Sequence, residues 1–257
     1  MDPGVTPSVP VEFVAVPERE TATEGLDAVE LMERALRHAD SVEKIGELSR
    51  KHELPVIGTS YEGPMYDRSK HSQIFDDASL VIERVAKLGG RTLGTSVGDA
   101  GRKKTEDELD AQAELVRRLR TVAQKHGVVL NLHNHIYEVK DNEYDLRGTL
   151  ARIPDAKLGP DLDWLTGAGE NPADFIRRYS SRIVYMHIQD RKANGEWSEA
   201  VGEGVIDYAA VRKALDAIPY QGDVAIELAH PKGFQLTRPL RESWKMSREY
   251  VRRVLGY

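Results

Sequence analysis

The stretch VVLNLH, residues 128–133, indicates the fold class. Its branched apolar residues are typical of a strand buried in a parallel sheet, and it ends on the imidazole of His133. The preceding segment, 105–126, has the spacing of an amphipathic helix. Thr105 and Glu108 at its start match the S/T-x-x-E pattern of a capping box. A helix followed by a buried strand indicates parallel pairing with helices outside.

The same alternation extends over most of the chain. Further strands are predicted at 11–16, 54–59, 91–96, 156–163, 183–188 and 223–228. Helices are predicted at 25–52, 77–88, 171–179, 208–218 and 239–255. This order predicts an α/β fold, a (β/α) barrel of the TIM type. A doubly wound open sheet is the alternative, which the missing Gly-rich turn after an early strand disfavours.

Length and composition limit the possibilities further. The 257 residues fit one barrel domain over 1–257, with an irregular proline-containing segment at 1–10. The net charge of −6 argues against a nucleic-acid partner. The chain has no cysteine, so a metal would be held by His, Asp and Glu. No apolar run approaches the ~20 residues that span a bilayer, and no signal peptide is evident. We therefore expect no membrane partner and a cytoplasmic location.

Four predicted strands end on side chains that can bind a metal: His133, Asp163, His187 and Glu227. The carboxyl ends of barrel strands surround one mouth, so we expect these side chains to meet there. The period-two alternation of a strand also places Asp161 on the face of Asp163. Carboxylates favour Mg²⁺ or Mn²⁺, and imidazoles shift the preference toward Mn²⁺, Co²⁺ or Zn²⁺. Taken singly, each residue could instead be structural, for example an Asp that caps a helix.

Other polar side chains near these strand ends are candidates for substrate binding. Gln189 and Tyr61 are such candidates, and Trp164 is either a stacking platform for a sugar or part of the core. Glu203 either lines the mouth or occupies a turn. Asp190 is expected to hold a loop.

Several motifs occur together in a characteristic order. They are HNHxxE at 133–138, LDW at 162–164 with GAG at 167–169, RIVYMHIQD at 182–190, GEGVID at 202–207, and YQG at 220–222 before VAIE at 224–227. On these motifs, the chain from about residue 56 onward resembles the sugar phosphate isomerase/epimerase superfamily. These are xylose-isomerase-like barrels that include inosose dehydratases and keto-glycoside lyases or hydratases.

The resemblance implies roles for individual residues. In the superfamily the last four strands end in a metal-binding Glu, Asp, His and Glu. Asp163, His187 and Glu227 take the last three places, and His133 stands at the first. Within the HNHxxE subgroup His133 is then the metal ligand, with His135 or Glu138 as substitutes. The implied catalytic groups are Glu227, His135 and Glu138, and the implied cofactor is Mn²⁺, Mg²⁺ or Co²⁺, with Zn²⁺ as a further option.

The resemblance also implies a reaction on a small-molecule sugar. A proton is removed beside a carbonyl, through a metal-bound enediolate. Because His133 replaces a Glu, the two opposed bases of an epimerase are lost. Isomerisation of a sugar or keto-sugar with one base is therefore the first hypothesis. The second is a lyase or dehydratase reaction on a keto-sugar or keto-glycoside, by β-elimination or hydration.

Weaker alternatives are phosphodiester cleavage, as in endonuclease IV, and a non-catalytic sugar-binding barrel. No Gly-rich phosphate loop is evident, so a phosphorylated substrate is not expected. Counting back from the last four strands makes 11–16 the second strand, so that the first β/α unit is shortened or absent. The open edge would be completed by 1–10, or by another subunit in a homo-oligomer.

Overall fold

The computed structural model describes residues 25–228, 230 and 233–257. The strands in this part are β1 (Val29–Leu31), β2 (Val56–Glu62), β3 (Thr92–Ser96), β4 (Val129–Leu132), β5 (Lys157–Leu158), β6 (Tyr185–Ile188) and β7 (Asp223–Ile226). Neighbouring strands pair in parallel and in chain order, β1 to β5 in one sheet and β6 with β7 in another. Isolated parallel bridges, Leu158 with Ile183 and Asp161 with His187, connect β5 to β6.

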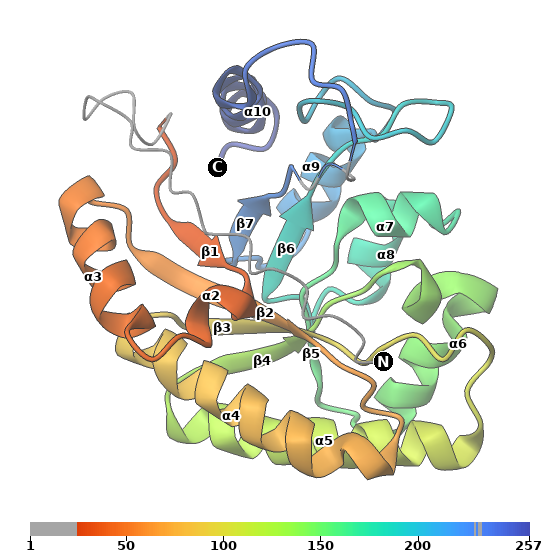
Figure 1. The fold of residues 1–257 in the computed structure, drawn as a ribbon. Helices are drawn as coiled ribbons and strands as arrows, with labels where there is room; N and C mark the ends of the chain where they lie inside the picture. Colours follow the sequence, from red (N-terminus) through yellow and green to blue (C-terminus); the bar gives the residue numbers. More distant parts are fainter. Residues whose placement is uncertain (1–24, 229, 231–232) are drawn as a thin grey trace.

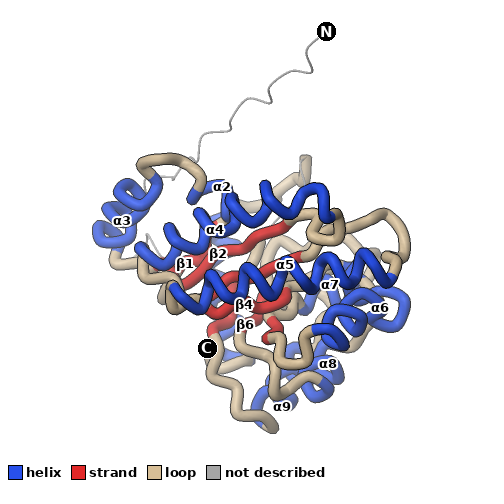
Figure 2. Tube along the Cα trace, turned by 90° about the horizontal axis from the view of Figure 1, so that it is seen from below, coloured by secondary structure: helices blue, strands red, loops and turns tan. Residues whose placement is uncertain are grey.

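Helices lie around the outside of the strands (Figures 1 and 2). They are α2 (Glu33–Leu36), α3 (Ser41–His52), α4 (His71–Lys87), α5 (Glu106–Lys125), α6 (Ile136–Arg152), α7 (Leu162–Gly167), α8 (Pro172–Arg178), α9 (Tyr208–Asp216) and α10 (Leu240–Val254), with a 3₁₀ turn, η1, at Arg68–Lys70. The strand order never reverses, so the doubly wound alternative is excluded and the predicted TIM-type barrel is confirmed. No helix of the described residues is long and apolar enough to cross a membrane.

Two predicted elements were wrong in part. The predicted helix 25–52 contains strand β1, followed by the separate helices α2 and α3. Pairing with β2, including the bond from Val29 N–H to the carbonyl of Pro55 at 2.9 Å, overrides the helix-like spacing of the segment. Of the predicted strand 156–163, only β5 and an isolated bridge at Asp161 pair with neighbouring strands before α7 begins. Helix α6 was not predicted.

Local sequence signals explain several helix ends. The capping box of α5 is confirmed, because Thr105 Oγ1 accepts from the N–H of Glu108 at 3.3 Å and Glu108 Oε2 accepts from the N–H of Thr105 at 2.8 Å. Gly89, with φ +90°, follows the end of α4 in a conformation that favours glycine. Inside the barrel, Gly159 is required for space, since a Cβ there would lie 2.0 Å from Asn131 Oδ1.

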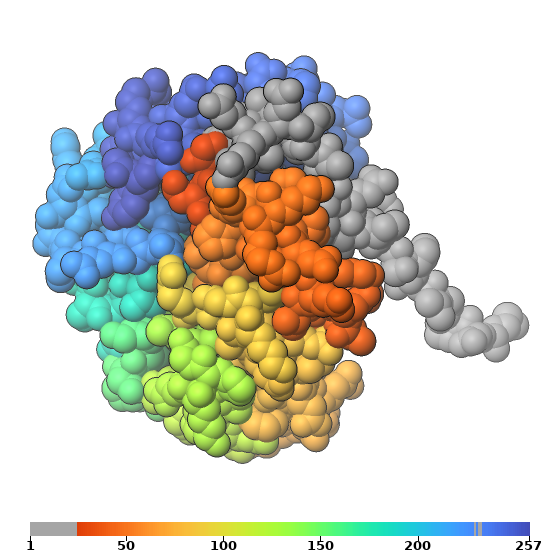
Figure 3. All heavy atoms as spheres, turned by 90° about the vertical axis from the view of Figure 1, so that its left-hand side faces the viewer, coloured from red at the N-terminus to blue at the C-terminus, as the bar shows by residue number. Residues whose placement is uncertain are grey.

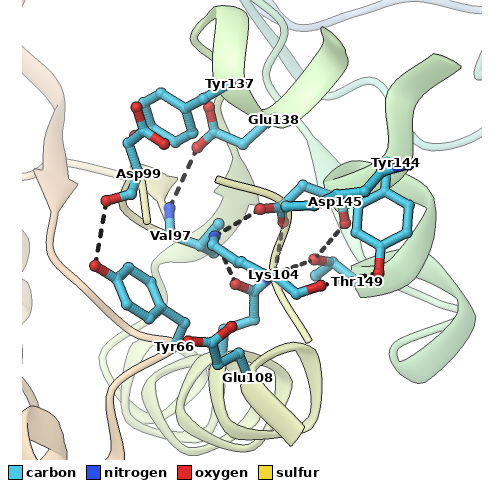
Figure 4. A network of polar contacts seen from close by, with 12 residues as sticks. Tyr66, Val97, Asp99, Lys104, Glu108, Tyr137, Glu138, Tyr144, Asp145 and Thr149 are labelled. Atoms are coloured by element: carbon cyan, nitrogen blue, oxygen red, sulfur yellow. Dashed lines mark hydrogen bonds and ion pairs between the residues drawn. The ribbon is translucent and has the colours of Figure 1, made fainter. Parts of the chain in front are cut away.

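A buried polar network fixes α6 against α5 (Figure 4). Lys104 Nζ lies 2.6 Å from Asp145 Oδ2 and donates to Gln112 Oε1 at 2.8 Å. Gln112 in turn donates to Asp145 and to Thr149. Helix α6 is interrupted at 140–143, where three consecutive residues have positive φ. The network therefore holds the part of α6 that follows this break against α5.

Strands β1 and β7 are the two edge strands, and they lie on either side of a gap in the barrel wall. No backbone pairing joins these two strands within the described part of the chain. Arg248 of α10 ties the chain before β1 in place by donating to the carbonyl of Gly25 and to Asp27 Oδ2. In Figure 3 the red start of this segment lies beside the dark blue C-terminal part. The predicted strand 11–16 and the irregular segment 1–10 lie outside the described residues, and completion of the edge by another subunit stays a prediction.

Candidate active site

A cavity of about 720 Å³ occupies the barrel interior and continues between β1 and β7. This volume lies within the ~300–1,000 Å³ of small-molecule sites. Its polar lining includes Glu30, Glu62, His133, His135, His187 and Glu227. The cavity thus brings three of the four predicted metal ligands to one space, as their positions at strand ends predicted.

His187 is the most constrained of these side chains. Its Nε2 lies 2.6 Å from Glu30 Oε2, and the hydroxyl of Tyr185 donates to the same oxygen at 2.9 Å. Burial lowers the pKa of His187, but Glu30, Glu227 and Asp161 outweigh it and raise the pKa to about 9. Glu30 comes from β1, which was predicted to be helical, so sequence reasoning missed it.

His133 and His135 stand next to His187. The ring centroids of His133 and His187 are 4.8 Å apart in an edge-to-face arrangement, and those of His133 and His135 are 5.1 Å apart. Ser96 Oγ lies 3.1 Å from His135 Nδ1. Burial, with His187 and His135 nearby, lowers the pKa of His133 well below its usual range. A neutral His133 is the form that can bind a metal ion.

The structure places the two aspartates after β5 in different surroundings. Asp163 forms a bidentate pair with Arg191, at 2.8 Å to Nε and 2.5 Å to an Nη atom, and accepts from Trp197 Nε1 at 2.9 Å. Asp161 instead bridges to His187 in the backbone and is fully buried. The predicted placement of Asp163 was wrong because the strand ends early and Asp161 caps α7, which turns Asp163 away.

Within the described chain, Asp161 has one carboxylate oxygen with a partner and one without. Its Oδ1 accepts from the N–H groups of Asp163 and Trp164, while its Oδ2 is buried without a partner among the described residues. Burial, and then the charge of Glu227, raises the pKa of Asp161 to about 8. The mutual influence of Asp161, Glu227 and His187 indicates that the three side chains share one site.

Several polar atoms around these strand ends are buried without a partner among the residues that the structure describes. Buried atoms that lack a partner in the described part of the chain include Glu30 Oε1, Asn131 Oδ1, His133 Nδ1, Asp161 Oδ2, His187 Nδ1 and Gln189 Nε2. Unpaired buried polar groups are costly and rare in proteins. Among the described residues no group of three or more His, Asp or Glu side chains is arranged to hold a metal ion. The donor atoms nevertheless fit a divalent ion by their chemistry, after side-chain adjustment.

Glu138 has a different position from the one expected of a catalytic group. Its Oε2 accepts from the N–H of His135 at 2.7 Å and its Oε1 from the N–H of Val97 at 3.3 Å (Figure 4). Burial raises the pKa of Glu138 to about 8, against the effect of these backbone bonds. Glu138 therefore supports the HNHxxE loop through its backbone.

Not all of the predicted substrate-binding residues have a polar group that is free to face the cavity. Tyr61 lines it, but its hydroxyl donates outward to Asp77 Oδ2 at 2.9 Å. Both carboxylate oxygens of Glu203 pair with Arg238 on the surface. Gln189 is 1% exposed, and its Nε2 is among the unpartnered atoms.

The sequence leaves Trp164 as either a stacking platform or part of the core, and it predicts that Asp190 holds a loop. The Trp164 ring lies 5.5 Å from the rings of His135 and Trp197, beside the site and partly buried. Asp190 accepts from the N–H groups of Arg191, Gly202, Gly204 and Ile206. The expectation that Asp190 holds a loop is confirmed, and Trp164 stays a candidate stacking surface.

A family model described as a xylose isomerase-like TIM barrel matches residues 19–254. The chain belongs to this family. The superfamily that the motifs indicated is therefore confirmed, and with it the general class of sugar isomerase- and epimerase-like proteins.

Individual relatives of this xylose isomerase-like protein carry several activities. An inosose dehydratase from Geobacillus thermodenitrificans is 24% identical over 171 residues, covering 59% of this chain and 56% of that protein. The chain thus matches little more than half the length of this curated relative. A 3-keto-D-glucoside 4-epimerase from E. coli has a TM-score of 0.73 at 18% identity, with 93% and 96% of the two chains covered. D-psicose 3-epimerase from Clostridium cellulolyticum, solved with D-tagatose, has a TM-score of 0.72 at 17% identity, with 92% and 91% covered. These two likenesses support the fold alone.

Proposed function

We propose that this protein is a divalent-metal-dependent isomerase of a sugar or keto-sugar. It removes a proton from the carbon beside a carbonyl and returns it to the neighbouring carbon. The observation that carries this proposal is the convergence of Glu227, His133 and His187 on one cavity, with Asp161 next to His187 and Glu227. Donor atoms of His133, Asp161 and His187 are buried without a partner among the described residues.

The proposed ligands are Asp161, His187 and His133, with Glu227 at the edge of the set. Asp161 replaces Asp163 here because both oxygens of Asp163 are engaged by Arg191 and Trp197. A bound Mn²⁺, Mg²⁺ or Co²⁺ supplies Lewis acidity that polarises the carbonyl and makes the adjacent C–H more acidic.

Glu227 is the proposed base. Within the described residues no hydrogen bond engages its carboxylate, unlike those of Glu30 and Glu62, and burial raises its pKa, which strengthens it as a proton acceptor. His135, held at Nδ1 by Ser96, is the candidate to carry a proton between the substrate oxygens.

A solvent-exchange measurement tests this proposal. With Mn²⁺ in D₂O, we expect the protein to incorporate deuterium at the carbon beside the carbonyl of its substrate, because the abstracted proton equilibrates with solvent on a single base. Ketoses, keto-glycosides and an inosose are incubated with the metal-loaded protein and followed by ¹H NMR. The same protein with EDTA is the control. A protein that binds no divalent ion and exchanges no proton with any of them would contradict the proposal.

Dehydration is the second candidate function. It is favoured by the sequence relatives named inosose dehydratase. It is also favoured because, of the cavity carboxylates Glu30, Glu62 and Glu227 in the described part of the chain, only that of Glu227 accepts no hydrogen bond. It begins with the same proton removal but ends with loss of a hydroxide, which leaves as water after protonation. In the same NMR experiment a lyase yields an unsaturated or diketo product, whereas an isomerase yields a ketose or aldose of unchanged mass.

The affinity for Mn²⁺ should rise with pH. Burial and Glu227 raise the pKa of Asp161 to about 8, and the surrounding carboxylates raise that of His187 to about 9. Both groups then hold protons near neutrality, and an ion must displace them. Displacement of both protons corresponds to a gain in affinity of up to roughly a hundredfold per pH unit from about pH 6 to 8, and displacement of one proton to roughly tenfold. Isothermal titration at several pH values measures the slope, and a flat profile would exclude proton displacement by the ion.

A further inference from the structure

Strand β1 brings one carboxylate into the barrel that none of the roles above uses. Glu30 lies beside His187, with its Oε2 2.6 Å from His187 Nε2. The Tyr185 hydroxyl donates to this same oxygen at 2.9 Å. The side chains of His187 and Glu30 are 7% and 12% exposed, so the contact is largely shielded from water.

This contact leaves the imidazole with one free nitrogen. Nε2 of His187 is occupied by Glu30, whereas Nδ1 is buried and has no partner among the described residues. Histidines that bind metals commonly donate their other ring N–H to a carboxylate, which fixes the tautomer and the ring orientation. The pair has this arrangement, with Nδ1 left as the ligand atom.

We propose that Glu30 is a positioning residue that holds the Nε2–H of His187 and so presents Nδ1 to the divalent ion. The inference rests on the proposed metal-dependent function and deepens it. It assigns Nδ1 as the ligand atom of His187. It also gives strand β1 a role in the site, although the proposed ligands come from β4 and the strands that follow it.

Tyr185 also supports this arrangement, through contacts with both Glu30 and His187. It precedes His187 by two residues on β6, so both side chains point into the barrel. Its ring packs edge-to-face against His187 with centroids 5.2 Å apart, and it is 1% exposed. Its bond to Glu30 Oε2 restricts the carboxylate to the orientation that meets Nε2.

Glu30 could instead leave His187 and bind the ion itself. The two roles differ in what a variant changes. Loss of an outer partner lowers metal affinity by roughly 10–100-fold while the set of ligands stays the same. Loss of a ligand also changes the coordination of the ion, which alters the visible absorption of bound Co²⁺.

The experiment titrates the purified full chain with Mn²⁺ by calorimetry and records the absorption of the Co²⁺-loaded protein. For Glu30→Gln we expect Mn²⁺ binding weakened by roughly 10–100-fold, with the Co²⁺ band shape retained. Glu33→Gln removes the same charge three residues away, where Glu33 pairs with Arg37, and should bind as the wild type does. Tyr185→Phe should weaken Mn²⁺ binding by a few-fold, and it decides the question if Glu30→Gln does not fold.

The outcomes separate the inference from the proposed function. If the wild type binds Mn²⁺ and Glu30→Gln binds it with the same affinity, the positioning role is overturned and the proposed function stands. If Glu30→Gln does not fold, an unchanged affinity in Tyr185→Phe has the same meaning. A changed Co²⁺ band in Glu30→Gln overturns it in favour of direct ligation. A wild-type protein that binds neither ion overturns the proposed function, and the positioning role with it.

Discussion

Replacing Glu227 with glutamine is expected to slow deuterium exchange into the substrate by roughly 10²–10⁴-fold, the usual contribution of a general base. Glutamine has nearly the same shape but cannot accept the proton. Glu227 directly follows strand β7 and lines the cavity, and burial raises the pKa of its carboxyl group. The rate is measured at saturating Mn²⁺, so that weaker metal binding by the variant does not count as loss of the base.

Glu62→Gln is the matched control for this variant. Glu62 also lines the cavity, but its Oε1 accepts from the Tyr137 hydroxyl at 2.9 Å. We expect exchange within about tenfold of the wild-type rate, since one hydrogen bond is altered and the proposed base is kept. If Glu227→Gln exchanged as fast as wild type while Glu62→Gln did not, Glu62 would be the base.

The second large effect is expected from Asp161→Asn. The substitution replaces a charged oxygen ligand with a neutral amide, so Mn²⁺ binding should weaken by more than the roughly 10–100-fold typical of an outer partner. Asp163→Asn should leave Mn²⁺ binding within a few-fold of wild type, because Arg191 and Trp197 already engage that carboxylate. Calorimetric titration of both variants measures the difference.

Asp163→Asn should have its effect on stability instead. It leaves the Arg191 guanidinium, which is 13% exposed, without its counter-charge. Removal of one member of a buried ion pair costs up to about 3–5 kcal/mol in the free energy of unfolding. Urea denaturation followed by circular dichroism measures this. A stable Asp163→Asn that no longer binds Mn²⁺ would restore Asp163 as the ligand.

Local signals made much of the fold predictable. The capping box of α5 depends on residues within a few positions of one another, and it was read from the sequence. Strands β2, β3, β4, β6 and β7 were recognisable as apolar runs in the sequence. A barrel strand is covered by the barrel interior on one face and by helices on the other, so both of its faces are largely apolar.

The short strands were not predictable in the same way. Strand β1 has three residues, too few for a period to show, and only its pairing with β2 defines it. Strand β5 has two, so the parity rule applied beyond its end placed Asp161 and Asp163 on one face. The sequence therefore did not distinguish Asp161 from Asp163, and it did not place Glu30 in the site.

The sequence by itself determined the parallel α/β barrel, the family, and the strand ends that carry His133, His187 and Glu227, because apolar periodicity and motif order are properties of neighbouring residues. Only the tertiary structure decided which polar groups remain available inside. Arg191 engages Asp163 from 28 positions away, and Glu30 meets His187 from 157 positions away. Contacts across such distances depend on how the strands close around the cavity, and no local pattern encodes them.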